Sequence, residues 1–279
     1  MVNLSPVSLY INSRFATLRN GLTSDIEITL KNNLIVPRNI QIHCRVLNAQ
    51  IPISYYVCNE SNNTLNYTIG GNSYSFSVPI GNYTAKQLAS QLNLNSISAS
   101  YDGKTNKMTF SASSSFSFES STTIWELIGF SEGLKSSSNN ILISDLVCDT
   151  SGPNAVYLHS NLDNTNFDTT GTTSILSKFP QNTAANGILN YSNKQDSNYT
   201  ILKTRDLNVL NFELRDERGD VINLNGIHWE CQLLFSFHYV DVYDKTKAID
   251  TTANANIFQG NNDFIYTHEI KKQEEKVIN

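Results

Sequence analysis

The sequence predicts an all-β protein: a single jelly-roll β-sandwich that carries a small α+β insertion. Apolar and polar residues alternate with a period of two in several long segments, which is typical of strands with one buried face. Tyr and Phe, which favour strands, occur 13 times each. With 279 residues and 39% hydrophobic residues, the chain can bury the core of one large β domain or two modest ones.

Two alternating segments lie near the N-terminus and predict the first pair of long strands. Pro37 separates them, and it ends the first segment because proline cannot donate to a sheet ladder. The apolar positions of the two segments are Ile26, Ile28 and Leu30, followed by Ile40, Ile42, Cys44 and Val46.

The most regular alternation lies near the C-terminus and predicts a hairpin-like pair of strands around the turn sequence RDERGD. Their length and apolar content require partners from elsewhere in the chain. The apolar positions are Leu210, Phe212 and Leu214 before the turn, Ile222 and Leu224 after it, and then Trp229, Cys231, Leu233, Phe235, Phe237 and Tyr239.

Residues 60–135 have a different pattern, which predicts the order β-β-α-β-β-α. Gly70-Gly71 and Asp102-Gly103 mark two hairpin turns. Thr84 is a suitable N-cap for a short amphipathic helix, and a second short helix ends near Gly129.

These segments predict a discontinuous domain organisation. Residues 1–24 form an N-terminal arm, 25–59 and 136–243 form the jelly roll, 60–135 form the inserted domain, and 244–279 form a C-terminal tail. Two β domains in series are an alternative. The insertion is favoured because the apolar strands within 207–242 need partners from the N-terminal segments.

Composition excludes several classes of protein. A net charge of −5 gives no basic field for a nucleic acid, and no apolar run is long enough to span a membrane. The N-terminus does not resemble a signal peptide. The four cysteines form no CxxC pair, and Cys44 and Cys231 fall in phase with apolar strand positions, which predicts buried free thiols in a reducing compartment.

No enzyme motif is present, so we expect no catalytic residues, no metal site, no cofactor and no enzymatic activity. The five histidines lack ligand spacing. His43 and His238 fall on the polar face of strands, which predicts histidines in contact with solvent or an interface. Acidic residues around the turn at 213–220 predict a solvated loop, with a calcium site as the alternative.

Arg218, Gly219 and Asp220 form the one candidate binding motif. An exposed Arg-Gly-Asp turn can present a guanidinium and a carboxylate to a receptor. The simpler interpretation is structural, in which Gly219 supplies the positive φ angle of a hairpin turn and its neighbours are ordinary turn residues.

Six segments of the chain occur in a characteristic order. They are VLNAQIPISYYVCN, SFSVPIGNYTAKQLASQLN, YDGKTNKMTFS, TIWELIGF, AVYLHSNL and LNFELRDERGDVINLNGIHWECQLLFSF. Their most specific pieces are Gly81-Asn82-Tyr83-Thr84, Leu127-Ile128-Gly129-Phe130 and the closing hairpin that ends at Trp229. Taken in this order, the segments resemble the penton (minor capsid) proteins of virophages and of related polinton-like viruses, and the resemblance covers about residues 40–240.

This resemblance implies a structural virion protein. Five copies would form the homopentameric capsomer at each fivefold vertex of an icosahedral capsid, in contact with the major capsid protein, after synthesis in the host cytoplasm. The family supplies no catalytic residues. A receptor- or glycan-binding β-sandwich, such as an attachment protein, is the alternative function, and an enzyme of the cupin kind would need clustered histidines that the sequence lacks.

Overall fold

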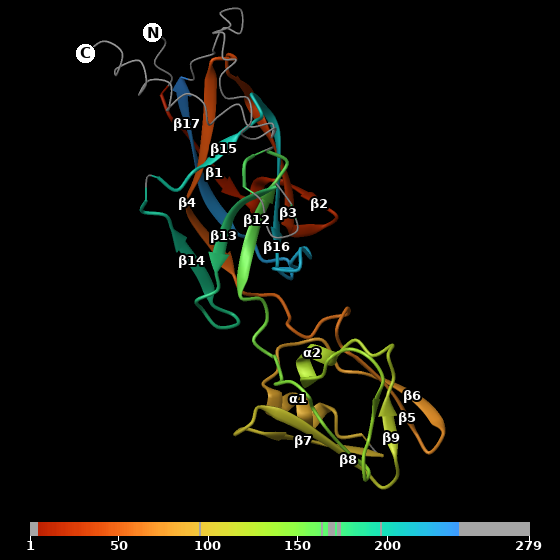
Figure 1. The fold of residues 1–279 in the computed structure, drawn as a ribbon. Coiled ribbons are helices and arrows are strands. Elements are labelled where there is room, and N and C mark those ends of the chain that lie inside the picture. Colours follow the sequence, from red (N-terminus) through yellow and green to blue (C-terminus); the bar gives the residue numbers. More distant parts are fainter. Residues whose placement is uncertain are drawn as a thin grey trace, which may run out of the picture. The chain divides into compact units, whose positions relative to one another are not determined.

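The structure is a computed structural model that describes residues 5–94, 96–162, 164–166, 171, 174–195 and 197–239. The predicted C-terminal tail, 244–279, lies outside these residues. The fold is all-β, as predicted, and two five-stranded antiparallel sheets form its larger part (Figure 1).

The first sheet has the strand order β1-β17-β4-β14, and β15 also pairs with β4. The longest pairing joins β17 to β4, which lie side by side in Figure 1 and come from opposite ends of the chain. Its strands are β1 (Val7–Asn12), β4 (Ile40–Pro52), β14 (Ile188–Ser192), β15 (Thr200–Leu202) and β17 (Glu230–Tyr239).

The second sheet has the strand order β13-β12-β16-β3-β2. Consecutive strands such as β3 and β4, or β16 and β17, lie in different sheets, as expected for jelly-roll connections. Its strands are β2 (Thr17–Arg19), β3 (Leu22–Ile35), β12 (Ala155–Ser160), β13 (Ile175–Pro180) and β16 (Asp206–Arg215).

One buried apolar cluster fills the space between these two sheets. It contains the alternating positions that predict the strands, including Ile42, Cys44, Phe212 and Leu233, and Trp229 is its largest member. Trp229 is fully buried, and its indole Nε1 donates a hydrogen bond to the Thr23 carbonyl oxygen (2.8 Å). The period-two pattern therefore identifies the faces that meet in the core.

The N-terminal residues differ from the predicted arm. β1 pairs with β17 along its whole length, and β2 pairs with β3, so both strands belong to the sandwich. Between them lies a 3₁₀ turn, η1 (Ser13–Phe15). β1 has six residues and β2 has three, and each is paired on one side in the described sheets. Strands this short show too little alternation to be detected from the sequence.

A second buried apolar cluster belongs to the strands and helices between residues 58 and 148. These strands form a four-stranded sheet, β10-β9-β5-β6, and a three-stranded sheet, β11-β8-β7. The elements are β5 (Thr64–Ile69), β6 (Asn72–Ser77), α1 (Ala85–Gln91), β7 (Ile97–Asp102), β8 (Lys107–Ala112), β9 (Phe116–Phe118), α2 (Trp125–Ile128), β10 (Lys135–Ser136) and β11 (Ile141–Ile143).

The predicted local signals in this region are confirmed at the residue level. Thr84 and Gln87 form a capping box at α1, and Gly129 ends α2 in the left-handed conformation (φ 77°). Gly70 and Gly71 both have positive φ in the β5–β6 turn. The β7–β8 turn lies where it is predicted, but its positive φ belongs to Asn106 and not to Gly103.

Candidate functional site

The Arg218-Gly219-Asp220 motif lies in a tight turn directly after β16. The Asp216 carboxylate accepts hydrogen bonds from the backbone N–H groups of Arg218 and Asp220, both at 2.9 Å. The Gly219 N–H donates to the Asp216 carbonyl oxygen (3.1 Å). Gly219 has a φ of 89°, as the structural interpretation predicts. The turn is therefore held by Asp216 and by the conformational freedom of Gly219.

The two charged side chains of the motif have different surroundings. One Arg218 guanidinium nitrogen lies 2.7 Å from the Glu126 carboxylate. Partial burial opposes the charged form, but Glu126 and the acidic residues of the turn outweigh it and raise the pKa of Arg218 above its usual value. Asp220 is exposed. A receptor would thus find the carboxylate accessible and the guanidinium already paired.

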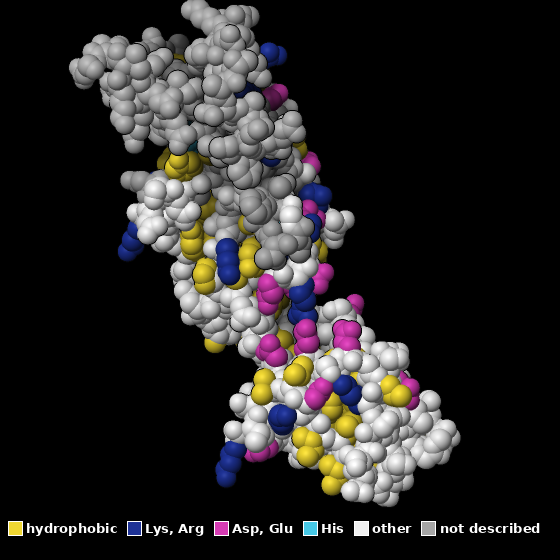
Figure 2. Space-filling view, in the orientation of Figure 1, with side chains coloured by type: hydrophobic (Ala, Val, Ile, Leu, Met, Phe, Trp, Pro, Cys, Tyr) yellow, Lys and Arg dark blue, Asp and Glu magenta, His cyan; other side chains and the backbone are white. Residues whose placement is uncertain are grey.

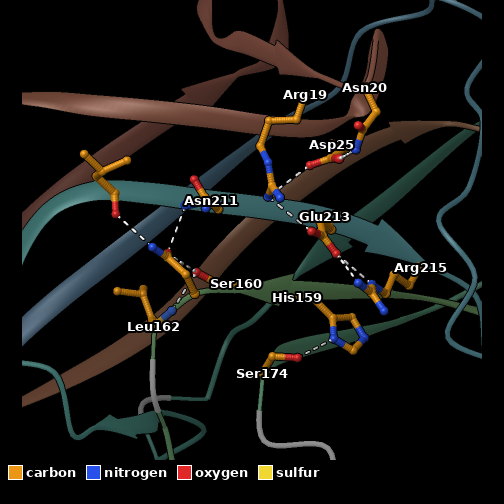
Figure 3. A network of polar contacts seen from close by, with 12 residues as sticks. Arg19, Asn20, Asp25, His159, Ser160, Leu162, Ser174, Asn211, Glu213 and Arg215 are labelled. Carbon is orange, nitrogen blue, oxygen red and sulfur yellow. Dashed lines mark hydrogen bonds and ion pairs between the residues drawn. The ribbon is translucent and has the colours of Figure 1, made fainter.

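Arg215 connects this turn to a polar network on the outer face of the second sheet (Figure 3). Its guanidinium donates to the Gly219 carbonyl oxygen (3.1 Å) and, through Nε, to the Glu213 carboxylate (2.8 Å). Because Phe212 and Leu214 point into the core, Glu213 points outward. It lies between His159 on β12 and Asp25 on β3 in the cross-strand register.

Arg19 of β2 neutralises the two carboxylates of this network. One guanidinium nitrogen lies 3.3 Å from Asp25 and 3.2 Å from Glu213, and the Asn20 amide donates to the other Asp25 oxygen (2.9 Å). Like charges directly opposite each other destabilise a sheet, so a shared cation is needed between Asp25 and Glu213. Since Asp25 is only 2% exposed, this arrangement is structural.

A hollow of about 260 Å³ lies beside the network, and its lining includes Arg19, His159, Ser174 and Glu213. The Ser174 hydroxyl lies 2.8 Å from His159 Nδ1, a pairing that also occurs in hydrolases. In a hydrolase the acid orients the histidine, whereas Glu213 here binds two guanidinium groups. The geometry therefore favours an ion-pair network over a catalytic triad.

His43 and His238 lie on the outer face of the first sheet, but His43 is less exposed than predicted. Its ring is stacked between Tyr199 (4.1 Å between centroids) and His238 (4.0 Å), which leaves it 8% exposed. Burial, and then the charge of His238, lower the pKa of His43 to about 4. Tyr199, 156 positions away in the sequence, supplies the cover that the local alternation could not reveal.

Within the part of the chain that the structure describes, no three His, Cys, Asp or Glu side chains are grouped so that they could hold a metal ion, the acidic turn at 213–220 included. All four cysteines are free, and Cys44 and Cys231 are buried as predicted. Burial raises the pKa of the Cys44 thiol to about 12, which makes it unreactive.

Comparisons with known proteins gave matches among solved structures. No family model matches the chain, and no curated protein matches it. Among solved structures, one match is the crystal structure of the mavirus penton protein, with 11% identity, a TM-score of 0.43, and coverage of 84% of this chain and 100% of that one. This match is a virophage penton protein. It belongs to the group that the sequence segments resemble.

Two further matches come from bacteriophage P23-77. One is the complex of its two major capsid proteins, VP16 and VP17 (8% identity, TM-score 0.17, 84% of this chain and 100% of that one). The other is VP17 alone (10% identity, TM-score 0.14, 84% and 97%). All three matches are viral capsid proteins. At these identities and TM-scores they carry no argument about function, which has to come from the residues of this chain.

Among the described residues coloured in Figure 2, basic and acidic side chains are interspersed with apolar and uncharged ones, and they form no extended basic area on the face shown. None of the helices among the described residues is long and apolar enough to cross a membrane.

Proposed function

We propose that this chain is a structural virion protein, a penton subunit whose five copies form the capsomer at the fivefold vertices of an icosahedral capsid. Its activity is assembly and not catalysis. Its partners are copies of itself and the major capsid protein of the same virion, and it is made in the host cytoplasm. The order of the segments over residues 40–240, which resembles penton proteins, supports this assignment.

The observation that carries the proposal is that exposed apolar side chains lie on both lateral sides of the sandwich. β1 and β2 form one side, where Tyr10 is 73% and Phe15 84% exposed. β13 and β14 form the opposite side, where Ile188 is 54% exposed. A ring needs two different surfaces that meet head to tail, and a sandwich with different apolar residues on its two sides offers them.

We also assign a domain division, which rests on the two buried clusters and on the strand pairing. The jelly roll consists of the two five-stranded sheets, and the inserted domain consists of the elements that share the second buried cluster, with strands from β5 to β11. The inserted strands continue past residue 135 to Ile143, because β11 completes the sheet of β7 and β8.

Negative-stain images of the purified protein test this proposal against the alternative of an attachment protein. Rings with five subunits support a penton. Trimeric particles, together with retention on a glycan array, would favour a receptor- or glycan-binding sandwich and contradict the penton assignment. The exposed carboxylate of Asp220, which a receptor could bind, is the feature that supports this alternative.

A further inference from the structure

We propose that Phe15 of one copy packs into a hollow on the opposite lateral side of the next copy, and that Arg14 pairs there with Glu217. This inference rests on the proposed ring and names the two surfaces that close it. The hollow measures about 330 Å³ and is formed by residues 151–154 and 181–184.

Phe15 is held out from the sandwich by a rigid base. The turn η1 begins with Ser13, which is fully buried. The Ser13 N–H donates to the Trp229 carbonyl oxygen, and the Trp229 N–H donates to the Ser13 hydroxyl, both at 3.0 Å. The residue before Ser13, Asn12, donates a hydrogen bond from its side-chain amide to the Glu230 carboxylate (2.7 Å). Because the backbone beneath the ring is fixed, binding has to order only the Phe15 side chain, as expected for an interface anchor.

The two loops that form the hollow are held by backbone hydrogen bonds. The Gln181 N–H donates to the Asn154 carbonyl oxygen of the other loop (2.9 Å), and within the second loop the Gly187 N–H donates to the Ala184 carbonyl oxygen (3.0 Å). The Tyr55 hydroxyl also bonds to the Gln181 side chain. The hollow is open to solvent, and most of its lining is polar, so the Phe15 ring would lie against its apolar part, which is formed by Gly152, Pro153 and Ala184.

The anchor and the hollow lie near the same end of the sandwich. β1 ends at Asn12, which faces Glu230, and Glu230 faces Gln50 of β4. On the other side, β14 starts at Ile188 opposite Pro52, only two residues further along β4, or about 7 Å. A ring closes without a rise only when the two contact surfaces lie at the same height along its axis. For an axis parallel to the strands, these two surfaces meet that condition.

The charges beside the two surfaces are opposite. Arg14 is exposed directly next to Phe15. At the hollow, the exposed Glu217 carboxylate lies 3.4 Å from the Asn154 backbone nitrogen. Opposite charges at the rim of a contact favour the correct partner and register. The same charges disfavour a contact between two identical sides, so the second copy is expected to dock head to tail.

A cysteine cross-linking experiment tests the contact. The variant with Thr17→Cys and Ala184→Cys keeps Phe15, and Thr17 is exposed two residues after it. It is oxidised in its assembled state and compared with Thr17→Cys combined with Val209→Cys, which lies near the start of β16, away from the Glu217 turn. We expect rings from both variants, and disulfide-linked chains from the first variant alone. Rings of the first variant that form without cross-links overturn this contact and leave the penton proposal intact. A protein that forms no rings contradicts the penton proposal, and the contact fails with it.

A charge exchange gives an independent measurement, because both side chains are exposed. Arg14→Glu alone and Glu217→Arg alone are expected to raise the ring's dissociation constant about tenfold each. The double variant should recover most of the loss. Single effects without recovery in the double variant mean that Arg14 and Glu217 do not meet, and the inference is then wrong.

Discussion

At the scale of single residues, buried charge and backbone conformation explain most of what the structure shows. The carboxylates of Asp25 and Glu213 are stable side by side because Arg19 lies between them. This arrangement could not be predicted from the sequence, since the three residues come from three different strands. The same is true of the cover that Tyr199 gives His43.

Replacing Arg19 by Met should lower the free energy of unfolding by about 1–3 kcal/mol, because Asp25 and Glu213 then face each other without a cation. Chemical denaturation measures the change. Arg38→Met, at an exposed position, is the matched control and should change stability by less than about 0.5 kcal/mol. Equal effects of the two substitutions would show that Arg19 does not stabilise the carboxylates.

Substitutions in the Arg218-Gly219-Asp220 turn separate its two interpretations. Gly219→Ala should lower the free energy of unfolding by about 1 kcal/mol, because its φ of 89° strains any residue with a Cβ atom. Asp220→Glu should leave stability unchanged. If Asp220→Glu abolishes attachment to host cells while Gly219→Ala does not, the motif is a receptor ligand and the structural interpretation is wrong.

His43 should make stability depend on pH between about 6.5 and 4. Its folded pKa of about 4 lies below the ordinary value of 6.5, so the unfolded chain takes up a proton first as the pH falls. Stability is therefore complete above pH 6.5 and decreases by about 1–3 kcal/mol toward pH 4. Denaturation of His43→Phe, which keeps a ring in the stack, should lack this part of the decrease. Parallel curves for the two proteins would refute the assignment.

At the scale of elements, the sequence predicts best where a pattern is long or a cap is specific. β4 and β17 follow from their period-two alternation, and α1 and α2 follow from Thr84 and Gly129. β1 and β2 could not be predicted, because their place depends on pairing with strands far along the chain. For the same reason, the anchor at Phe15 appears only in the folded structure.

Gly129 offers a direct test of how the second helix ends. A Cβ atom there would lie 2.8 Å from the backbone oxygen of Leu146, in addition to the strain of positive φ. Gly129→Ala should therefore lower the free energy of unfolding by about 2–4 kcal/mol. Gly71→Ala is the matched control, since its φ of 81° is close to that of Gly129 but its Cβ would meet open space. Chemical denaturation should show a clearly smaller loss for Gly71→Ala, and equal losses would contradict the packing described for Gly129.

At the scale of the whole molecule, the chain has two buried clusters, and the sandwich has two different lateral sides. The sandwich joins segments from both ends of the chain, so its sides carry residues from distant parts of the sequence. The proposed contact of Phe15 with the hollow at 151–154 and 181–184 uses one feature from each side, which suits assembly with identical copies.

The mass of the purified particle, measured by light scattering over a range of concentrations, tests the central claim most directly. One chain has a mass of 31.2 kDa. The account predicts a particle of five chains that dissociates when Phe15 is replaced by Ser. A particle of three chains, or a single chain at every concentration, would contradict it.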